Sequence, residues 1–336
     1  MTVARLRRSS PTDVGWTRRR AGRGFAYLDA SGRRLRDSDV ERVRGLAIPP
    51  AWEQVWICPY ENGHLQATGF DAAGRRQYLY HPQWVAQRDA EKFDRARTLG
   101  AAMPDVRDRV EKDLARPGMP QERAAALAVR LLDLGCFRIG SDTYAEEHGS
   151  IGLCTLTRGH VRRRGGAVVF AFTGKAGVDH RIVVDDLEAV EGVASLRRRR
   201  EGFAELLAFK EANRWRRLVP ELVNEYIRDT SGVEASAKDF RTWHATVLAA
   251  LLLGEGEAAA GRRANATQRR RQRRAVFEEV AEFLGNTPTM ARTSYVDPRV
   301  VEAHERGRVI PAPGGEPGTR RRQEEAERSV LDLLGG

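Results

Sequence analysis

The chain changes its sequence pattern near Pro82, and this change limits the folds that it can adopt. Before Pro82, short runs of β-branched and aromatic residues are separated by turn residues such as Asn62-Gly63. Runs of this kind predict short antiparallel strands joined by tight turns. After Pro82, apolar residues recur mostly at helical spacing. We therefore expect an α+β protein, with a small antiparallel β-sheet domain at the N-terminus and a mostly α-helical domain after it.

The N-terminal part is expected to combine a basic arm with a small sheet. Residues 1–36 are rich in arginine and have few acids before Asp29. An arm of this kind is either solvated or bound to a polyanion. A strand is predicted over residues 24–28, helical turns over 40–46, and three further strands over 55–58, 65–69 and 77–80.

The later part of the chain is expected to be helical around one small sheet. Glycine pairs and alternating residues predict three strands joined by hairpin turns, and Pro104, Pro117 and Pro120 punctuate the helices. The predicted helices cover 84–99, 121–134, most of 185–228, 236–253 and 268–283, and the predicted strands cover 160–164, 167–173 and 180–184. We divide the chain into an N-terminal sheet domain (1–88), a helical domain (89–310), and a Pro/Gly linker with a short peripheral helix (311–336).

The overall charge favours a polyanion as partner. The net charge is +11, and arginine supplies most of the basic residues. The planar guanidinium suits bidentate phosphate contacts, although arginine richness also follows from the base composition of a genome. The cysteines Cys58, Cys136 and Cys154 are far apart in sequence, so we expect buried thiols rather than disulfides. The longest apolar run, Val247–Leu252, is far shorter than the roughly 20 residues of a membrane span, and we expect a cytoplasmic protein.

Several common catalytic motifs are absent from the sequence. There is no G-x-x-x-x-G-K-[ST], no H-E-x-x-H and no set of His, Cys, Asp or Glu at metal-ligand spacing. Nucleotide hydrolysis and two-metal nuclease chemistry are therefore not indicated. Any phosphate chemistry would have to be carried out by arginine, lysine and tyrosine.

Two arginines occupy positions that point toward the protein interior. Arg138 lies between apolar neighbours beside Gly140, and Arg241 lies at the edge of the apolar face of the predicted helix 236–253. A buried guanidinium needs a carboxylate or a phosphate, because an unpaired buried charge is unfavourable. For Arg138 the alternatives are a salt bridge with Glu146 or Glu147 and a site for an anion.

A lysine and three tyrosines each allow a structural and a functional interpretation. Lys175 is expected at a hairpin tip between two glycines, where a lysine is either solvated or functional. Tyr78 and Tyr80 project to one face of a strand, and they either pack in the sheet or stack on a nucleic acid. Tyr295 is expected in the last turn of a short helix that begins at Thr287-Pro288 and ends before Pro298. In that position it would be nearly exposed, as a packing residue or as a catalytic one.

Seven segments of the chain resemble one known family. They are GFAYLDASG, LAIPPAWEQVWICP, GHLQATGFDAAGRRQYLYHP, FRIGSDTYAEEHGSIGLCTLTRGHV, FTGKAGVDH, KDFRTWHA and LGNTPTMARTSYVDP, in this order from about Gly24 to about Pro311. Together they resemble the type IB DNA topoisomerases of the compact, poxvirus-like bacterial kind. The resemblance implies the catalytic fold shared by tyrosine recombinases and topoisomerases IB.

The resemblance also implies a set of catalytic residues. Tyr295 would be the nucleophile, and Arg138, Lys175 and Arg241 would be its partners. The fifth position, usually histidine in the viral enzymes, is Asn286. An amide donates a hydrogen bond but carries no charge, so Asn286 would stabilise a phosphate oxygen without transferring a proton.

The implied reaction is transient cleavage of one strand of double-stranded DNA through a 3′-phosphotyrosyl intermediate, followed by rotation and religation. It would relax supercoils of either sign without ATP, metal or another cofactor, in a monomer at the bacterial nucleoid. The resemblance assigns DNA contacts to Gln77, Tyr78 and Tyr80 in the sheet domain, which would help to clamp the duplex, and to Tyr144 and Lys238 in the helical domain.

Two other functions compete with this interpretation. A tyrosine recombinase uses similar chemistry, but recombinases typically carry a histidine three residues before the second arginine, where this chain has Lys238. A non-enzymatic arginine-rich DNA-binding protein would explain the charge but not the joint occurrence of Arg138, Lys175, Arg241 and Tyr295. A minor reaction on RNA is compatible with the same residues.

Overall fold

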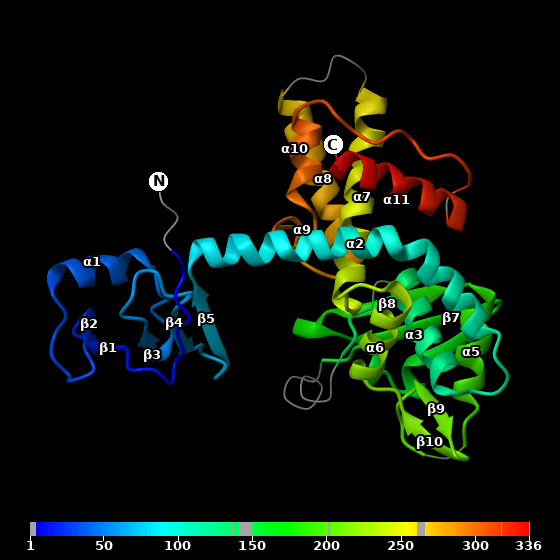
Figure 1. Cartoon of the computed structure of the whole chain (residues 1–336), viewed down its shortest axis with the longest axis horizontal. Helices are drawn as coiled ribbons and strands as arrows, with labels where there is room; N and C mark the ends of the chain where they lie inside the picture. Colours follow the sequence, from blue (N-terminus) through cyan, green and yellow to red (C-terminus); the bar gives the residue numbers. More distant parts are fainter. Residues whose placement is uncertain are drawn as a thin grey trace. The chain divides into compact units, whose positions relative to one another are not determined.

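The computed structural model describes residues 5–135, 137–140, 150–200, 202–260, 266–316 and 318–335 (Figure 1). Two compact units are present, Met1–Glu91 and Lys92–Gly336, and each has its own hydrophobic core. The first unit contains an antiparallel sheet, and the second is mostly helical with a small three-stranded sheet, which confirms the predicted α+β fold. In the described part of the chain, no helix combines the length and the apolar character needed to cross a membrane. The three-segment division at residues 88 and 310 stays a prediction.

The first unit is a five-stranded antiparallel sheet with one short helix. The strand order is β2-β1-β3-β4-β5, so β5 and β2 form the edges. A core of five apolar side chains, Val43, Ile48, Val55, Ile57 and Ala67, is buried in this unit. The elements are β1 (Trp16–Ala21), β2 (Gly24–Leu28), α1 (Asp37–Gly45), β3 (Glu53–Ile57), β4 (Leu65–Phe70) and β5 (Arg76–Tyr80).

The four strands predicted in this unit are confirmed, but β1 was missed as part of the basic arm. Its arginines hide the alternation that normally marks a strand. Arg18 is held within the protein, because its guanidinium donates hydrogen bonds to the carbonyl oxygens of Ile48, Pro49 and Trp52 at 3.1, 3.0 and 2.6 Å. This arginine therefore satisfies the carbonyls of the Pro-Pro turn and does not belong to an open arm.

The second unit contains most of the helices and two small sheets. Its elements are α2 (Pro82–Leu114, which begins in the first unit), α3 (Gln121–Gly135), η1 (Leu153–Thr155), η2 (Arg158–His160), β6 (Val161–Arg164), β7 (Ala167–Thr173), η3 (Lys175–Gly177), β8 (Asp179–Val184), α5 (Leu187–Arg197), β9 (Ala208–Glu211), β10 (Arg214–Arg217), α6 (Pro220–Ser231), α7 (Ala237–Ala260), α8 (Ala266–Leu284), α9 (Pro288–Ser294), α10 (Pro298–Glu305) and α11 (Arg320–Gly335). Helix α7 is longer than predicted, because it continues beyond Gly254 to Ala260.

Two predictions about this unit were wrong. Pro104 does not interrupt the helix, since α2 continues through it to Leu114 with Leu99, Met103 and Val106 buried. The packing of this apolar face compensates for the hydrogen bond that proline cannot make. The stretch 185–228 is not mostly helical, because it contains the β9–β10 hairpin, whose turn residues adopt left-handed conformations.

The three predicted strands β6, β7 and β8 form an antiparallel sheet in that order. Phe137, which follows α3, packs edge-on against Phe170 of β7 at 5.0 Å between ring centroids and stacks on Phe172 at 6.2 Å. The chain after α3 is thereby fixed to the sheet. Cys58 and Cys154 are buried thiols as expected, and Cys136 lies outside the described residues.

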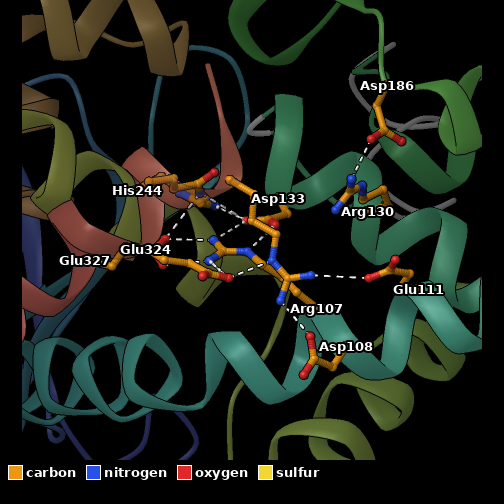
Figure 2. A network of polar contacts seen from close by, with 11 residues as sticks. Arg107, Asp108, Glu111, Arg130, Asp133, Asp186, His244, Glu324 and Glu327 are labelled. Atoms are coloured by element: carbon orange, nitrogen blue, oxygen red, sulfur yellow. Dashed lines mark hydrogen bonds and ion pairs between the residues drawn. The ribbon is translucent and has the colours of Figure 1, made fainter. Parts of the chain in front are cut away.

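A buried ionic network joins four helices of the second unit (Figure 2). Arg107 of α2 donates to Asp133 of α3 at 2.9 Å and to Glu327 of α11 at 2.7 Å, and His244 of α7 lies 3.1 Å from Asp133. Burial alone would raise the pKa of Asp133, but Arg107 and His244 hold it well below its usual value. Helix α11 was expected to be peripheral, and this expectation was wrong, because Ala326, Glu327 and Val330 are buried.

Candidate active site

The site is built around the C-terminal end of α8. Gly285 has φ +60°, and it allows the chain to reverse there. The Asn286 N–H donates to the carbonyl oxygen of Ala281 at 2.9 Å, and the Gly285 N–H donates to that of Glu282 at 3.1 Å. This is the pattern of a Schellman cap. It leaves the carbonyls of Leu284 and Gly285 directed away from the helix, where side chains can reach them.

Both arginines predicted from the sequence bind those two carbonyls. Arg241 of α7 is 4% exposed, and its Nη2 donates to the Leu284 oxygen at 2.7 Å. Arg138, in the segment after α3, donates through Nη2 to the Gly285 oxygen at 3.1 Å. Cations are favoured at the C-terminal end of a helix, because the dipole places partial negative charge there. Glu146 and Glu147, the alternative partners of Arg138, lie outside the described residues.

The orientation of the Asn286 side chain is fixed by Arg138. Arg138 Nη2 donates to Asn286 Oδ1 at 2.5 Å. A guanidinium only donates, so the amide oxygen must face Arg138 and the Nδ2 group must face the other way. Nδ2 is buried and has no partner of ordinary hydrogen-bond geometry in the described part of the chain. It lies close enough to the Tyr295 phenol to contribute to lowering its pKa.

Tyr295 follows α9 directly. The predicted helix start is confirmed, because the Thr287 side chain accepts from the Met290 N–H at 3.3 Å and Pro288 is the first helical residue. Two details differ from the prediction. Tyr295 is half-buried against the core rather than nearly exposed, and Pro298 begins the next helix, α10, instead of ending this one.

The backbone around Tyr295 is held by a fully buried threonine of α7. Thr246 Oγ1 accepts from the Asp297 N–H at 3.1 Å, and its single proton is shared between the carbonyl oxygens of Thr242 at 2.8 Å and Tyr295 at 3.3 Å. Thr246 is 2% exposed. The helix that carries Arg241 therefore also fixes the position of the tyrosine.

The charges around Tyr295 favour its ionised form. Burial of the phenol raises its pKa, but the charge and hydrogen bond of Arg241, the charge of Arg138 and the contact with Asn286 outweigh burial. The net result is a pKa below the ordinary value for tyrosine. The Arg241 guanidinium carbon lies 5.4 Å from the centre of the tyrosine ring. Burial and the neighbouring Arg241 in turn lower the pKa of Arg138, and the phenol opposes this shift.

Lys175 lies near this cluster on the turn between β7 and β8, and its side chain is exposed. A histidine of the same hairpin, His180, separates the turn from Arg138. Its Nε2 is 3.5 Å from Arg138 Nη1. We assigned no role to His180 from the sequence, although it closes the segment FTGKAGVDH. His180 of β8 is paired with Phe172 of β7, and this pairing becomes evident only from the strand register.

The described residues contain no group of three or more His, Cys, Asp or Glu side chains that could hold a metal ion. The site thus combines the buried guanidinium of Arg241, the half-buried guanidinium of Arg138, an amide and a phenol with a lowered pKa, and an exposed lysine lies on a nearby turn. Such a set can bind an anionic group and present an oxygen nucleophile to it.

Comparison with known families shows the family to which the chain belongs. The profile for the catalytic core of eukaryotic DNA topoisomerase I matches residues 81–306, and the profile for the N-terminal domain of bacterial DNA topoisomerase IB matches residues 24–71. The chain belongs to the type IB DNA topoisomerase family. It is therefore an isomerase that acts on DNA.

Individual topoisomerases are similar over different shares of the chain. The DNA topoisomerase 1B of Acanthamoeba polyphaga mimivirus is 27% identical over 280 residues, which is 81% of each protein. The DNA topoisomerase 1B of vaccinia virus strain Copenhagen is 27% identical over 133 residues, 40% of this chain and 42% of the viral protein. The DNA topoisomerase 1 of Schizosaccharomyces pombe is 28% identical over 163 residues, 48% of this chain and 19% of the yeast protein.

The predicted DNA-binding residues of this topoisomerase occupy different environments. Tyr78 and Tyr80 are exposed on the edge strand β5, with ring centroids 6.1 Å apart and nearly parallel planes. Gln77 lies on the opposite face of that strand and donates to Asp71 at 2.9 Å. Lys238 is exposed in the first turn of α7, and Tyr144 lies outside the described residues. The DNA-binding role of these five residues stays a prediction.

Proposed function

We propose that the protein relaxes supercoiled DNA by cutting one strand, with Tyr295 as the nucleophile. The observation that carries this proposal is the position of the Tyr295 phenol beside the buried Arg241, the half-buried Arg138 and the Asn286 amide, an arrangement that lowers the pKa of the phenol. Attack of the phenolate on a phosphodiester forms a bond from Tyr295 Oη to phosphorus. The bond from phosphorus to the 5′ oxygen breaks, and a 3′-phosphotyrosyl ester remains.

Arg138, Arg241 and Asn286 would stabilise the transition state. Negative charge builds up on the equatorial oxygens of the pentacoordinate phosphorus, and fixed donors reduce the energy of that charge. Arg138 and Arg241 are already anchored on the end of α8, so little reorganisation is needed when DNA binds. Asn286 can donate only through Nδ2, because its oxygen accepts from Arg138.

Lys175 would complete the reaction as a general acid. The departing 5′ oxygen needs a proton, and an ammonium group can supply one from a position within hydrogen-bond reach. The exposed side chain of Lys175 on a short turn leaves it accessible to a DNA backbone. The uncharged Asn286 cannot take over this proton transfer.

The ester conserves the energy of the broken bond, so the reaction as proposed needs neither ATP nor a metal. The free DNA end rotates about the intact strand, and its 5′ hydroxyl then attacks the ester to religate the strand. The enzyme would thus relax supercoils of either sign, and we propose that it acts as a monomer.

The test is the variant Tyr295→Phe. It should form no covalent adduct on a nicked suicide duplex after detergent quenching, and it should relax no plasmid. Tyr60→Phe is the matched control, because this exposed tyrosine lies in the first unit beside Arg7 and should leave both activities intact. An adduct that survives in Tyr295→Phe would disprove the assignment of the nucleophile.

The same substrates separate the competing functions. Relaxation of a plasmid without a defined site would exclude a recombinase, which needs paired sites and a multimer. DNA binding without any adduct in the wild type would instead favour a non-enzymatic binding protein.

We also propose that Tyr78 and Tyr80 contact DNA from the first unit, together with Gln77, and that Lys238 and Tyr144 contact it from the second. Phosphate contacts release counterions, so the logarithm of affinity should fall with the logarithm of salt by about 0.9 for each neutralised phosphate. Lys238→Gln should reduce that slope by about one contact. An unchanged slope in this variant would contradict a phosphate contact by Lys238.

A further inference from the structure

The ring of His180 fills a space between two glycine turns of the active site. Phe172, its cross-strand neighbour, stacks on one face at 5.2 Å between centroids. A Cβ added to Gly285 would lie 2.2 Å from His180 Cε1, and one added to Gly174 would lie 2.7 Å from His180 Cδ2. Only glycine fits at either position while the ring is present. The imidazole therefore sets the spacing between the turn before Lys175 and the turn before Asn286.

The ring also meets Arg138. His180 Nε2 lies 3.5 Å from Arg138 Nη1, which also belongs to the guanidinium that binds Asn286. An arginine has no acceptor atom, so only a histidine whose Nε2 carries no proton can accept from it. The contact consequently selects the neutral ring with its proton on Nδ1.

We propose that His180 is a positioning residue for DNA cleavage, whose neutral ring accepts a hydrogen bond from Arg138 and holds this arginine and Asn286 at their distance from the Lys175 turn. The inference rests on the proposed function of Arg138 and Asn286. It gives His180 a role through its neighbours, without contact to the phosphate.

The surroundings of His180 keep the ring neutral near physiological pH. Burial is the largest cause of its lowered pKa, the charges of Arg138 and Arg241 add to it, and Asp179 opposes it. Asp179 is held by Thr173, whose hydroxyl donates to Oδ1 at 2.8 Å. Below the pKa of His180 the ring gains a proton, loses its acceptor and repels Arg138. Loss of the tyrosinate alone makes cleavage fall gradually toward acid pH, and protonation of His180 should add a second, steeper fall. We call this additional fall the acid-side decrease.

Two substitutions test this role in single-turnover cleavage of a suicide duplex between about pH 5 and 8. His180→Ala should slow cleavage about tenfold or more without weakening DNA binding, because a hydrogen bond to a charged group is lost. His180→Gln places an amide oxygen near the position of Nε2 and has no titrating group. It should restore most of the rate and abolish the acid-side decrease.

His160→Gln is the matched control. His160 is also a histidine with a pKa lowered by burial, but its Nδ1 accepts from the backbone of Thr157. The acid-side decrease should remain in this variant. The inference is wrong if His180→Ala cleaves like the wild type, if His180→Gln is as slow as His180→Ala, or if the acid-side decrease persists in His180→Gln.

An NMR titration of His180 tests the inference without a measurement of activity. The wild type should show an unprotonated Nε2, and Arg138→Gln should raise the pKa of His180 because a positive charge is removed. An unchanged titration in Arg138→Gln would overturn the contact. If the wild type forms no tyrosine adduct, the proposed function fails, and this titration alone decides whether His180 pairs with Arg138.

Discussion

Two opposing effects act on the ionisation of the Tyr295 phenol, since burial disfavours it and two arginines favour it. The arginines prevail, so at any pH below the pKa more tyrosinate is present than in a free tyrosine. Cleavage limited by the tyrosinate should rise with pH and level off below pH 10.

Arg241→Gln should move this rise to higher pH. The substitution keeps the phenol buried but removes the charge, and part of the hydrogen bonding, that lowers its pKa. Single-turnover cleavage rates measured across the rise would show the shift. Arg306→Gln removes an exposed arginine that pairs with Glu302 and should leave the profile in place. An unshifted profile in Arg241→Gln would show that this arginine does not set the ionisation of Tyr295.

Thr246→Val tests whether cleavage requires that Thr246 fix the backbone around Tyr295. Valine has nearly the same shape but leaves the Asp297 N–H without its acceptor, which should destabilise the protein by about 1 to 3 kcal/mol. Cleavage should slow because the phenol is less well positioned. Urea unfolding and adduct formation measure the two effects. Thr230→Val removes only hydrogen bonds to the α6 backbone and should change neither by as much.

The structure brings together four residues that the sequence predicted as a site, Arg138, Arg241, Asn286 and Tyr295, but several of their contacts could not be predicted. The positions of Arg138 and Arg241 beside apolar residues indicated buried guanidiniums. The acceptors that hold them are backbone carbonyls of Leu284 and Gly285, and a main-chain oxygen leaves no signature in side-chain identity. His180 was missed for a related reason, because its contact with Arg138 depends on strand register.

At the scale of elements, the end of α8 determines where Asn286 lies. Gly285→Ala should be doubly unfavourable, since φ is +60° and the new Cβ would overlap the His180 ring. The backbone strain alone should cost about 1 kcal/mol. We expect reduced stability and, because Asn286 is displaced, a larger loss of cleavage than the stability change explains.

Gly232→Ala is the matched control for that variant. Gly232 caps α6 with φ +67°, and a Cβ there would meet no atom within 4 Å. The Gly232→Ala variant should lose about as much stability through backbone strain as Gly285→Ala does, and it should retain cleavage. Equal cleavage in the two variants would show that the overlap with His180 has no bearing on the site.

Elements with clear turn residues were predicted well, and those determined by tertiary packing were not. The strands of the β6-β7-β8 sheet are joined by glycine turns and were found. The β9–β10 hairpin turns at Ala212-Asn213, a pair that gives a weak turn signal, and it was missed. Pro104 indicated an interruption, but Gly100 packs so closely on the Trp243 ring that a Cβ would lie 2.4 Å away, and this packing supports the continuous helix.

At the scale of the whole second unit, α11 is a structural part of the core. Glu327→Ala would remove one of the two buried carboxylates that bind Arg107, and breaking such a buried pair costs about 3 to 5 kcal/mol. We expect a clear decrease in urea stability. The network links α3 and α7, which lead to Arg138 and carry Arg241, so cleavage should also decrease.

Arg320→Ala provides the comparison on the same helix. Arg320 pairs with Asp108, Glu111 and Glu324 at the surface, and exposed pairs of this kind contribute at most about 1 kcal/mol. The loss of urea stability in Arg320→Ala should therefore be small. If Glu327→Ala unfolds at the same urea concentration as the wild type, α11 does not stabilise the unit.

The separation of Arg107 and Glu327 has a consequence during protein synthesis. The two residues are 220 positions apart in the chain. At about 5 to 20 residues per second, the ribosome makes Arg107 roughly 10 to 45 s before its partner. During this interval the guanidinium lacks the Glu327 carboxylate and its remaining charge must stay hydrated, so the nascent unit cannot close fully around it. The proposed cleavage of DNA is thus expected to begin only after α11 has left the exit tunnel and Glu327 has reached Arg107.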